Sequence, residues 1–150
     1  MYTTAPRPGG KPRSNANGFT LLEVLIALIV LSIGLLGLAS LQANGLKHNH
    51  SAYLRSQAVT YAYDIIDRMR ANHSSAVAGN YSIAMTAGVP TGTSIPAADL
   101  AQWLTLVAGN LPAGDAETTI NGRVITVTVQ WDDTRAGGEA TEKLVVKSEL

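Results

Sequence analysis

The chain has 150 residues, with 11 Lys and Arg against 11 Asp and Glu, so its formal net charge is zero. This length suits one domain, and the absence of cysteine excludes disulfides, thiolate metal ligands and thiol nucleophiles. Three basic residues and no acidic residue precede Gly18, which leaves the rest mildly acidic: Arg7, Lys11 and Arg13. A dedicated nucleic-acid binder is therefore not expected, because such proteins carry a basic patch or stripe.

Residues 1–17 are rich in proline, glycine and small polar residues. This composition excludes a stable helix and a packed core. Positive charge next to an apolar segment stays in the cytoplasm under the positive-inside rule. We predict that residues 1–18 are a cytoplasmic leader peptide.

A long apolar segment runs from Phe19 to Leu41, and only four polar side chains interrupt it: Thr20, Glu23, Ser32 and Ser40. As a helix it would be about 34 Å long at 1.5 Å per residue, enough to cross a hydrocarbon core of about 30 Å. The apolar part of a signal peptide is shorter and precedes its cleavage site. Here the small residue Gly18 comes first, so the segment is predicted to be a membrane-spanning helix that stays on the mature protein.

Glu23 is a single carboxylate just inside this apolar segment. A charge at the centre of a membrane helix costs roughly 2.5–3.5 kcal/mol by insertion scales, and less near an end. One interpretation places Glu23 in the headgroup region, where it favours the positive N-terminus of the helix. In the other, cleavage after Gly18 creates an α-ammonium, and the ammonium of a neighbouring helix pairs with Glu23 and sets the register between subunits. We favour the second interpretation.

The stretch from Gly18 to Ala27, GFTLLEVLIA, resembles the class III signal, or N-methylation motif, of type IV prepilins and type II secretion pseudopilins. The resemblance implies that a prepilin peptidase cuts after Gly18, that Phe19 is then N-methylated, and that Glu23 acts in assembly. The following stretch, residues 32–72, is similar to the PilV family of minor pilins, the type IV pilus modification proteins. One departure from many major pilins is that no proline kinks the membrane helix.

The same helix is predicted to continue over residues 42–72 as an amphipathic half that ends near Asn72. Its apolar positions recur mostly at three- and four-residue spacing, which places them on one face: Leu46, Leu54, Ala58, Tyr61, Ile65 and Met69. The remaining residues are too few for a large core of their own. We therefore expect them to pack on this face.

Residues 73–150 are predicted to form a small α+β periplasmic head. Alternating residues predict a strand at 81–85, and helical spacing predicts a helix at 97–109. Asn121-Gly122 predicts a hairpin turn within 118–131, and a last strand follows at 143–147. The expected fold class is α+β: a long N-terminal helix with a small antiparallel sheet packed on its C-terminal half.

No catalytic constellation is recognised, so we expect no enzyme, cofactor or metal. His48 and His50 point in different directions on a helix, and with His73 they make a poor metal set. Asp132-Asp133 is interpreted as a solvated turn rather than a calcium loop. The remaining candidates also lack the required pattern: Gly88, Gly92 and Thr93 miss the lysine and spacing of a phosphate loop, and no serine lies in G-x-S-x-G. Trp103 and Trp131 are predicted to be core or interface anchors.

The resemblance implies a minor type IV pilin, a structural subunit that primes or modifies pilus assembly. Such a protein enters the inner membrane as a single-pass protein with a periplasmic C-terminal domain, and later reaches the pilus at the cell surface. The implied partners are the prepilin peptidase, the major pilin and other minor pilins, the inner-membrane assembly machinery and membrane lipid.

Three alternatives remain open at this stage. A minor pseudopilin of a type II secretion system shares the same chemistry. A single-pass membrane-anchored periplasmic binding protein or enzyme needs neither Glu23 nor cleavage at Gly18. An ordinary secreted protein would lose the whole apolar helix.

Overall fold

The computed structural model describes residues 18–150. Of the predicted leader, only Gly18 falls within the described residues. The chain divides into two compact units, which meet in the sequence between Ser40 and Leu41.

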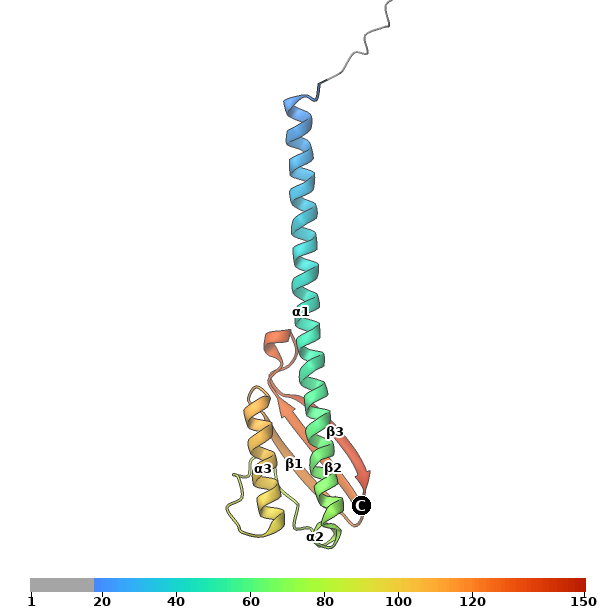
Figure 1. Cartoon of the computed structure of the whole chain (residues 1–150), viewed down its shortest axis with the longest axis vertical. Coiled ribbons are helices and arrows are strands. Elements are labelled where there is room, and N and C mark those ends of the chain that lie inside the picture. The colour runs from blue at the N-terminus through green and yellow to red at the C-terminus, as the bar shows by residue number, and fades with distance from the viewer. Residues whose placement is uncertain (1–17) are drawn as a thin grey trace, which may run out of the picture. The chain divides into compact units, whose positions relative to one another are not determined.

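Helix α1, Leu21–Ala71, begins in the first unit and ends in the second (Figure 1). Its last turn contains Arg68 and Arg70, whose positive charges interact favourably with the C-terminal end of a helix. A short helix, α2 at His73–Val77, follows directly. The predicted end of the long helix near Asn72 is therefore confirmed, although one further helical turn comes after it.

The C-terminal unit contains one sheet of three antiparallel strands in the order β1-β2-β3 (β1 Asp115–Asn121, β2 Val124–Trp131, β3 Glu142–Glu149). The central strand places Val127 opposite Thr118 of β1 and Val146 of β3. Because side chains alternate along a strand, one face of β2 is apolar and buried: Ile125, Val127, Val129 and Trp131. The predicted hairpin and last strand are confirmed.

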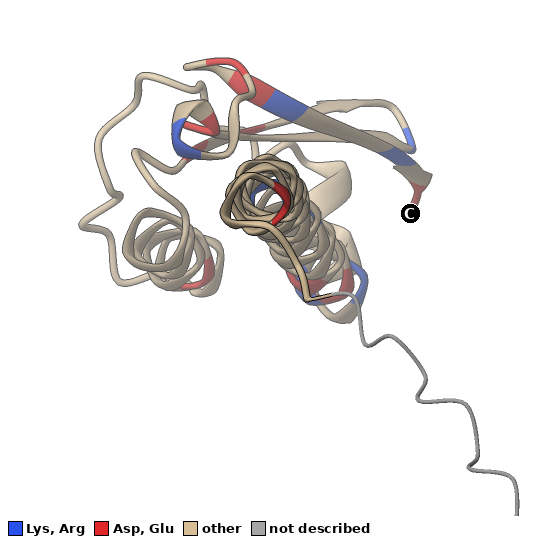
Figure 2. Cartoon of the chain, turned by 90° about the horizontal axis from the view of Figure 1, so that it is seen from above, with Lys and Arg blue, Asp and Glu red and all other residues tan. Residues whose placement is uncertain are grey.

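Helix α3, Ile95–Asn110, starts at a clear sequence signal. The backbone of Ser94 is extended, its Oγ accepts a hydrogen bond from the Ala97 N–H at 3.4 Å, and Pro96 lies in the first turn. One face of α3 is buried, with Leu100, Trp103 and Val107 among its side chains. Figure 2 shows α3 and the C-terminal part of α1 on the same side of the sheet.

A single hydrophobic core joins these elements within the C-terminal unit. The C-terminal part of α1 contributes one buried stripe: Leu54, Ala58, Ala62, Ile65, Ile66 and Met69. This stripe packs in one cluster with the buried faces of α3 and β2. The predicted fold class, α+β with a small antiparallel sheet packed on the C-terminal part of a long helix, is confirmed.

A polar network links α1 to α3 beside this core. The Arg68 guanidinium lies 3.1 Å from Asp64 and 3.4 Å from Asp99, and the Tyr81 hydroxyl donates to Asp99 at 2.6 Å. The Trp103 indole N–H donates to the Tyr61 carbonyl at 2.9 Å, a second link from α3 to α1. Burial, followed by the hydrogen bond to Asp99, raises the pKa of the Tyr81 phenol.

Three local predictions are wrong. The two residues of the hairpin loop are Gly122 and Arg123, because Asn121 pairs with Val124, and only Gly122 has the positive φ (62°) that a type II′ turn needs. The strand predicted at 81–85 is reduced to one bridge, between Ile83 and Thr118. Leu46 is 70% exposed, since the core begins only at Leu54.

We predict that Ile65→Ala lowers the free energy of unfolding of the C-terminal unit by about 2–5 kcal/mol, because it leaves a cavity in the core. Ile95→Ala is the matched control, since Ile95 is 67% exposed and Ile65 is fully buried. Urea denaturation followed by tryptophan fluorescence measures both. Equal losses from the two variants would contradict the described core.

The raised pKa of Tyr81 predicts how stability depends on pH. Because the pKa of Tyr81 is higher in the folded than in the unfolded protein, its protonated phenol stabilises the fold below about pH 10. This contribution is lost as the pH rises through the pKa of Tyr81 in the folded protein. Tyr81→Phe should therefore make the alkaline fall in stability shallower, while costing about 1–3 kcal/mol at neutral pH through the lost bond to Asp99. Thermal unfolding from pH 7 to 11 tests this, with Tyr63→Phe at an exposed tyrosine as the control. Identical pH profiles for the two variants would refute it.

Candidate functional site

The backbone just before α1 is exposed and non-helical. Gly18, Phe19 and Thr20 lie outside the helix, and all three are exposed. A Cβ added at Gly18 would meet no atom within 4 Å. The Gly18–Phe19 peptide bond is therefore in the kind of accessible, irregular backbone that proteases cut.

Thr20 caps the helix that follows. Its Oγ1 accepts a hydrogen bond from the Glu23 N–H at 3.2 Å, and its carbonyl accepts from the Val24 N–H at 3.2 Å. Threonine followed three residues later by glutamate is the sequence of a capping box. The sequence analysis missed this role of Thr20, although the T-x-x-E spacing signals it.

Glu23 lies in the first turn of α1, where a negative charge stabilises the helix N-terminus. Its side chain is exposed, and it forms no ion pair with any residue in 18–150. By contrast, the Ser32 hydroxyl donates to the Leu28 carbonyl at 2.7 Å and so is satisfied within its own helix. In an apolar environment the Glu23 carboxylate would need a partner from outside the described chain.

The apolar segment, Phe19–Leu41, is uncovered throughout. Phe19 is 83% exposed and Leu21 is 91% exposed, and every other residue up to Leu41 is exposed as well. Within residues 18–150, α1 is the one helix that is long and apolar enough to cross a membrane by length and composition. These side chains therefore need lipid or other apolar helices around them.

The other candidate residues are placed as follows. His48, His50 and His73 are exposed, and the described residues contain no group of three or more His, Asp or Glu that could hold a metal ion. Trp103 and Trp131 are buried, so their prediction as core anchors is confirmed.

The interpretation of Asp132-Asp133 as a solvated turn is wrong for Asp133. This residue is only 4% exposed, because its loop folds against α1, and the Ser51 hydroxyl donates to its Oδ2 at 2.6 Å. Asp132 is less buried and accepts a hydrogen bond from the Thr134 N–H at 2.9 Å. Hydrogen bonds from Thr134, with the nearby Arg135 charge, lower the pKa of the Asp132 carboxyl.

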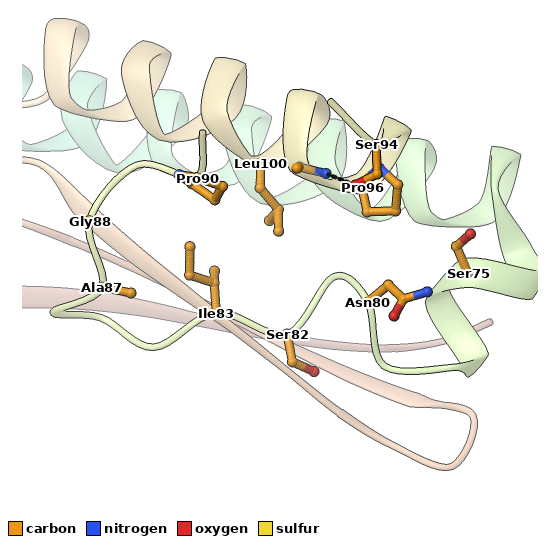
Figure 3. A pocket seen from close by; sticks show the side chains of 11 residues that line it. Ser75, Asn80, Ser82, Ile83, Ala87, Gly88, Pro90, Ser94, Pro96 and Leu100 are labelled. Atoms are coloured by element: carbon orange, nitrogen blue, oxygen red, sulfur yellow. Dashed lines mark hydrogen bonds between the residues drawn. The ribbon is translucent and has the colours of Figure 1, made fainter. Parts of the chain in front are cut away.

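Two surface grooves lie on the C-terminal unit. The first, of ≈ 620 Å³, lies between α2, the loop before α3 and the start of α3, and its polar side chains are serine hydroxyls and the Asn80 amide, with no titratable group (Figure 3). The second, of ≈ 590 Å³, is lined in part by His50, Tyr53, Asp132 and Arg135. Neither lining pairs a serine with a histidine or carboxylate.

Comparison with known proteins gives one match. Residues 13–39 match the family model of the prokaryotic N-terminal methylation motif. No curated protein and no solved structure matches the chain. The matched residues include the exposed Gly18–Phe19 bond, the Thr20 cap and Glu23. The motif therefore supports a type IV pilin- or pseudopilin-like protein and suggests a structural subunit. Together with the apolar helix, it also fits anchoring of the protein in a membrane.

Proposed function

We propose that this protein is a minor type IV pilin of the PilV kind, a structural subunit that primes or modifies pilus assembly. The observation that carries the proposal is the methylation motif, aligned with an exposed Gly18–Phe19 bond just before an uncovered apolar helix. The minor-pilin role rests further on the similarity of residues 32–72 to the PilV family.

Processing would begin with cleavage by the prepilin peptidase after Gly18, followed by N-methylation of Phe19. The cut would remove residues 1–18 and leave the Thr20 cap on the mature chain, because the cap's bonds from the Glu23 and Val24 N–H groups both lie after the cut. Residues 19–41 would then anchor the protein in the inner membrane, while residues 42–72 and 73–150 would form its periplasmic part. From there the subunit would enter the pilus and reach the cell surface.

Assembly would depend on the Glu23 carboxylate. An α-ammonium on a neighbouring subunit is an opposite charge that compensates the cost of a carboxylate in an apolar helix bundle. The pair would form only when the two helices are in the correct longitudinal register. The subunits would thus be held together by packing of their apolar helices, and one charge pair would select the longitudinal register of those helices.

The nearest alternative is a minor pseudopilin of a type II secretion system, which uses the same cleavage and the same carboxylate. Co-purified partners separate the two: the major pilin and other minor pilins in one case, and secretion pseudopilins in the other. A membrane-anchored periplasmic binding protein is the alternative from another class, and it requires no cleavage at Gly18.

Cleavage is tested by the intact mass and N-terminal residue of the protein from membranes with and without prepilin peptidase. We expect a chain that starts at methylated Phe19 only when the peptidase is present. Gly18→Leu should block the cut and leave the C-terminal unit folded, since Gly18 lies outside that unit and a Cβ added at Gly18 would meet no described atom within 4 Å. A wild-type chain that keeps residues 1–18 would indicate a plain anchor, and one cut beyond Leu41 would indicate a secreted protein.

Three variants separate the charge of Glu23 from its position in the capping box. Glu23→Ala removes both features, Glu23→Gln keeps a residue that suits the box but removes the charge, and Thr20→Ala removes the cap but keeps the charge. We expect all three to be membrane-stable and cleaved, with pilus incorporation lost about tenfold or more in both Glu23 variants, an effect of at least about 1.4 kcal/mol. Thr20→Ala should lose less. Immunoblots of sheared pili measure incorporation, and normal incorporation of Glu23→Gln would rule out the charge pair.

A further inference from the structure

One stretch of α1 has no tertiary support: residues 42–50, which we call the neck. All of its residues are exposed. Within residues 18–150, Ser51 is the first residue of α1 whose side chain bonds to another element, through its hydrogen bond to Asp133, and the buried stripe begins only at Leu54. None of the ion pairs in the described part of the chain involves a neck residue. The neck therefore depends on its backbone hydrogen bonds to remain helical.

The amino-acid sequence of the neck does not favour a helix. Several of its residues are among the weaker helix formers: Asn44, Gly45, His48, Asn49 and His50. Most helical stability in proteins comes from packing of one face against other elements, and the neck has no packed face. We therefore expect the helix to open more easily in the neck than in the stretches on either side of it.

Gly45 is not required by packing. A Cβ added at Gly45 would meet no described atom within 4 Å, whereas one added at Gly138 would clash with the Asp133 carboxylate. Gly34 also has no neighbour within 4 Å, but it lies inside the apolar segment, where small residues let apolar helices approach each other closely. Gly45 lies outside that segment, and a glycine in a water-exposed helix increases the freedom of the backbone.

Both stretches that flank the neck are better supported. On the C-terminal side, α1 is bonded to the loop after β2 through Ser51 and to β3 through the ion pair of Arg55 with Glu142, and it enters the core at Leu54. On the N-terminal side, lipid would hold the apolar segment helical, because its backbone N–H and C=O groups would find no other partners there. The boundary between the two compact units falls directly before the neck. Local opening of α1 is thus expected to concentrate in residues 42–50.

We propose that the neck is a hinge, at which α1 bends or opens locally so that residues 51–150 can change their orientation while residues 19–41 keep theirs. Hinges are a few residues, often small ones, that absorb a change of backbone angles. The inference rests on the proposed function, since it assumes a subunit that passes from lipid into a filament. Glu23 would set the register of the apolar helices, and the hinge would free the orientation of the C-terminal unit from that register.

The hinge is tested first in the membrane, where no filament is needed. Hydrogen–deuterium exchange of the full-length protein in phospholipid nanodiscs is measured by mass spectrometry. We expect the amides of residues 42–50 to exchange about tenfold or more faster than those of residues 58–66, because opening an unpacked helix requires less free energy than opening a buried one. Equal protection of the two stretches would refute the hinge.

A stiffened neck tests whether assembly uses the hinge. Gly45→Ala combined with Asn49→Ala should slow exchange in the neck roughly tenfold, because Ala is the better helix former at both positions. Incorporation into pili should fall by a similar factor, since the bent form becomes rarer to the same extent. Gly109→Ala is the matched control, because Gly109 is an exposed glycine of α3 with no neighbour within 4 Å, and it should change neither measurement.

A third variant separates backbone freedom from a contact made at Gly45 itself. Adding Ala43→Gly to the stiffened neck returns a glycine to the same stretch at another exposed position, and it should restore both exchange and incorporation. Failure of this rescue would indicate close packing of a partner on Gly45 and would overturn the hinge.

The N-terminal residue is determined in the same samples. A cleaved chain with a stiffened neck that enters pili normally would refute only the hinge, whereas an uncleaved wild-type chain would refute the proposed function itself.

Discussion

The constraint on which the rest of the protein depends is an apolar helical segment that no other described residue covers. A helix satisfies its own backbone hydrogen bonds, but it cannot bury its own side chains. Residues Phe19–Leu41 are exposed on all sides of α1, and apolar surface in water costs about 25 cal/mol per Å². The segment is therefore suited to lipid or to packing with other apolar helices, two environments that are similarly apolar. Under the proposed function, a subunit that moves from lipid into a filament needs a further interaction that selects one arrangement of helices, and the Glu23 carboxylate at the start of α1 would supply it.

At the start of α1, two properties of Glu23 coexist. Its backbone N–H bonds to Thr20 and completes the first turn, while its carboxylate has no ion-pair partner within residues 18–150. The two hydrogen bonds of the cap, from the Glu23 and Val24 N–H groups to Thr20, both lie after the Gly18–Phe19 bond. A capped helix N-terminus holds the carboxylate at a defined height, which is the property that a register-selecting charge requires.

Within the C-terminal unit, α1 acts as one wall of an ordinary small core. Its stripe from Leu54 to Met69 is buried with α3 and the sheet, and the network of Arg68, Asp99 and Tyr81 fixes α3 against it. That network also neutralises the one carboxylate of α3. Core stability and the uncharged outer side of α3 thus depend on the same contacts, because Arg68 and Tyr81 keep Asp99 from being a free surface charge.

Local patterns in the sequence were sufficient to predict the long helix, the second helix and the hairpin of the sheet. The membrane-length apolar run and the alternation of Ile125, Val127 and Val129 depend on residues a few positions apart, so the long helix and the antiparallel sheet could be predicted. The T-x-x-E start of α1 and the Ser94 and Pro96 start of α3 are equally local signals, but the sequence analysis did not use them. The sequence alone also determined the methylation motif, because that motif is a spacing along the chain. Tertiary structure decided what depends on distant residues. Asp133 is buried by Ser51 and by the loop in which Asp133 lies. Leu46 is exposed because the core begins farther along α1, and the strand pairing places the hairpin turn at Gly122-Arg123. The pairing of Asp99 with Arg68 joins residues 31 positions apart, and only that contact shows that α3 carries no free charge.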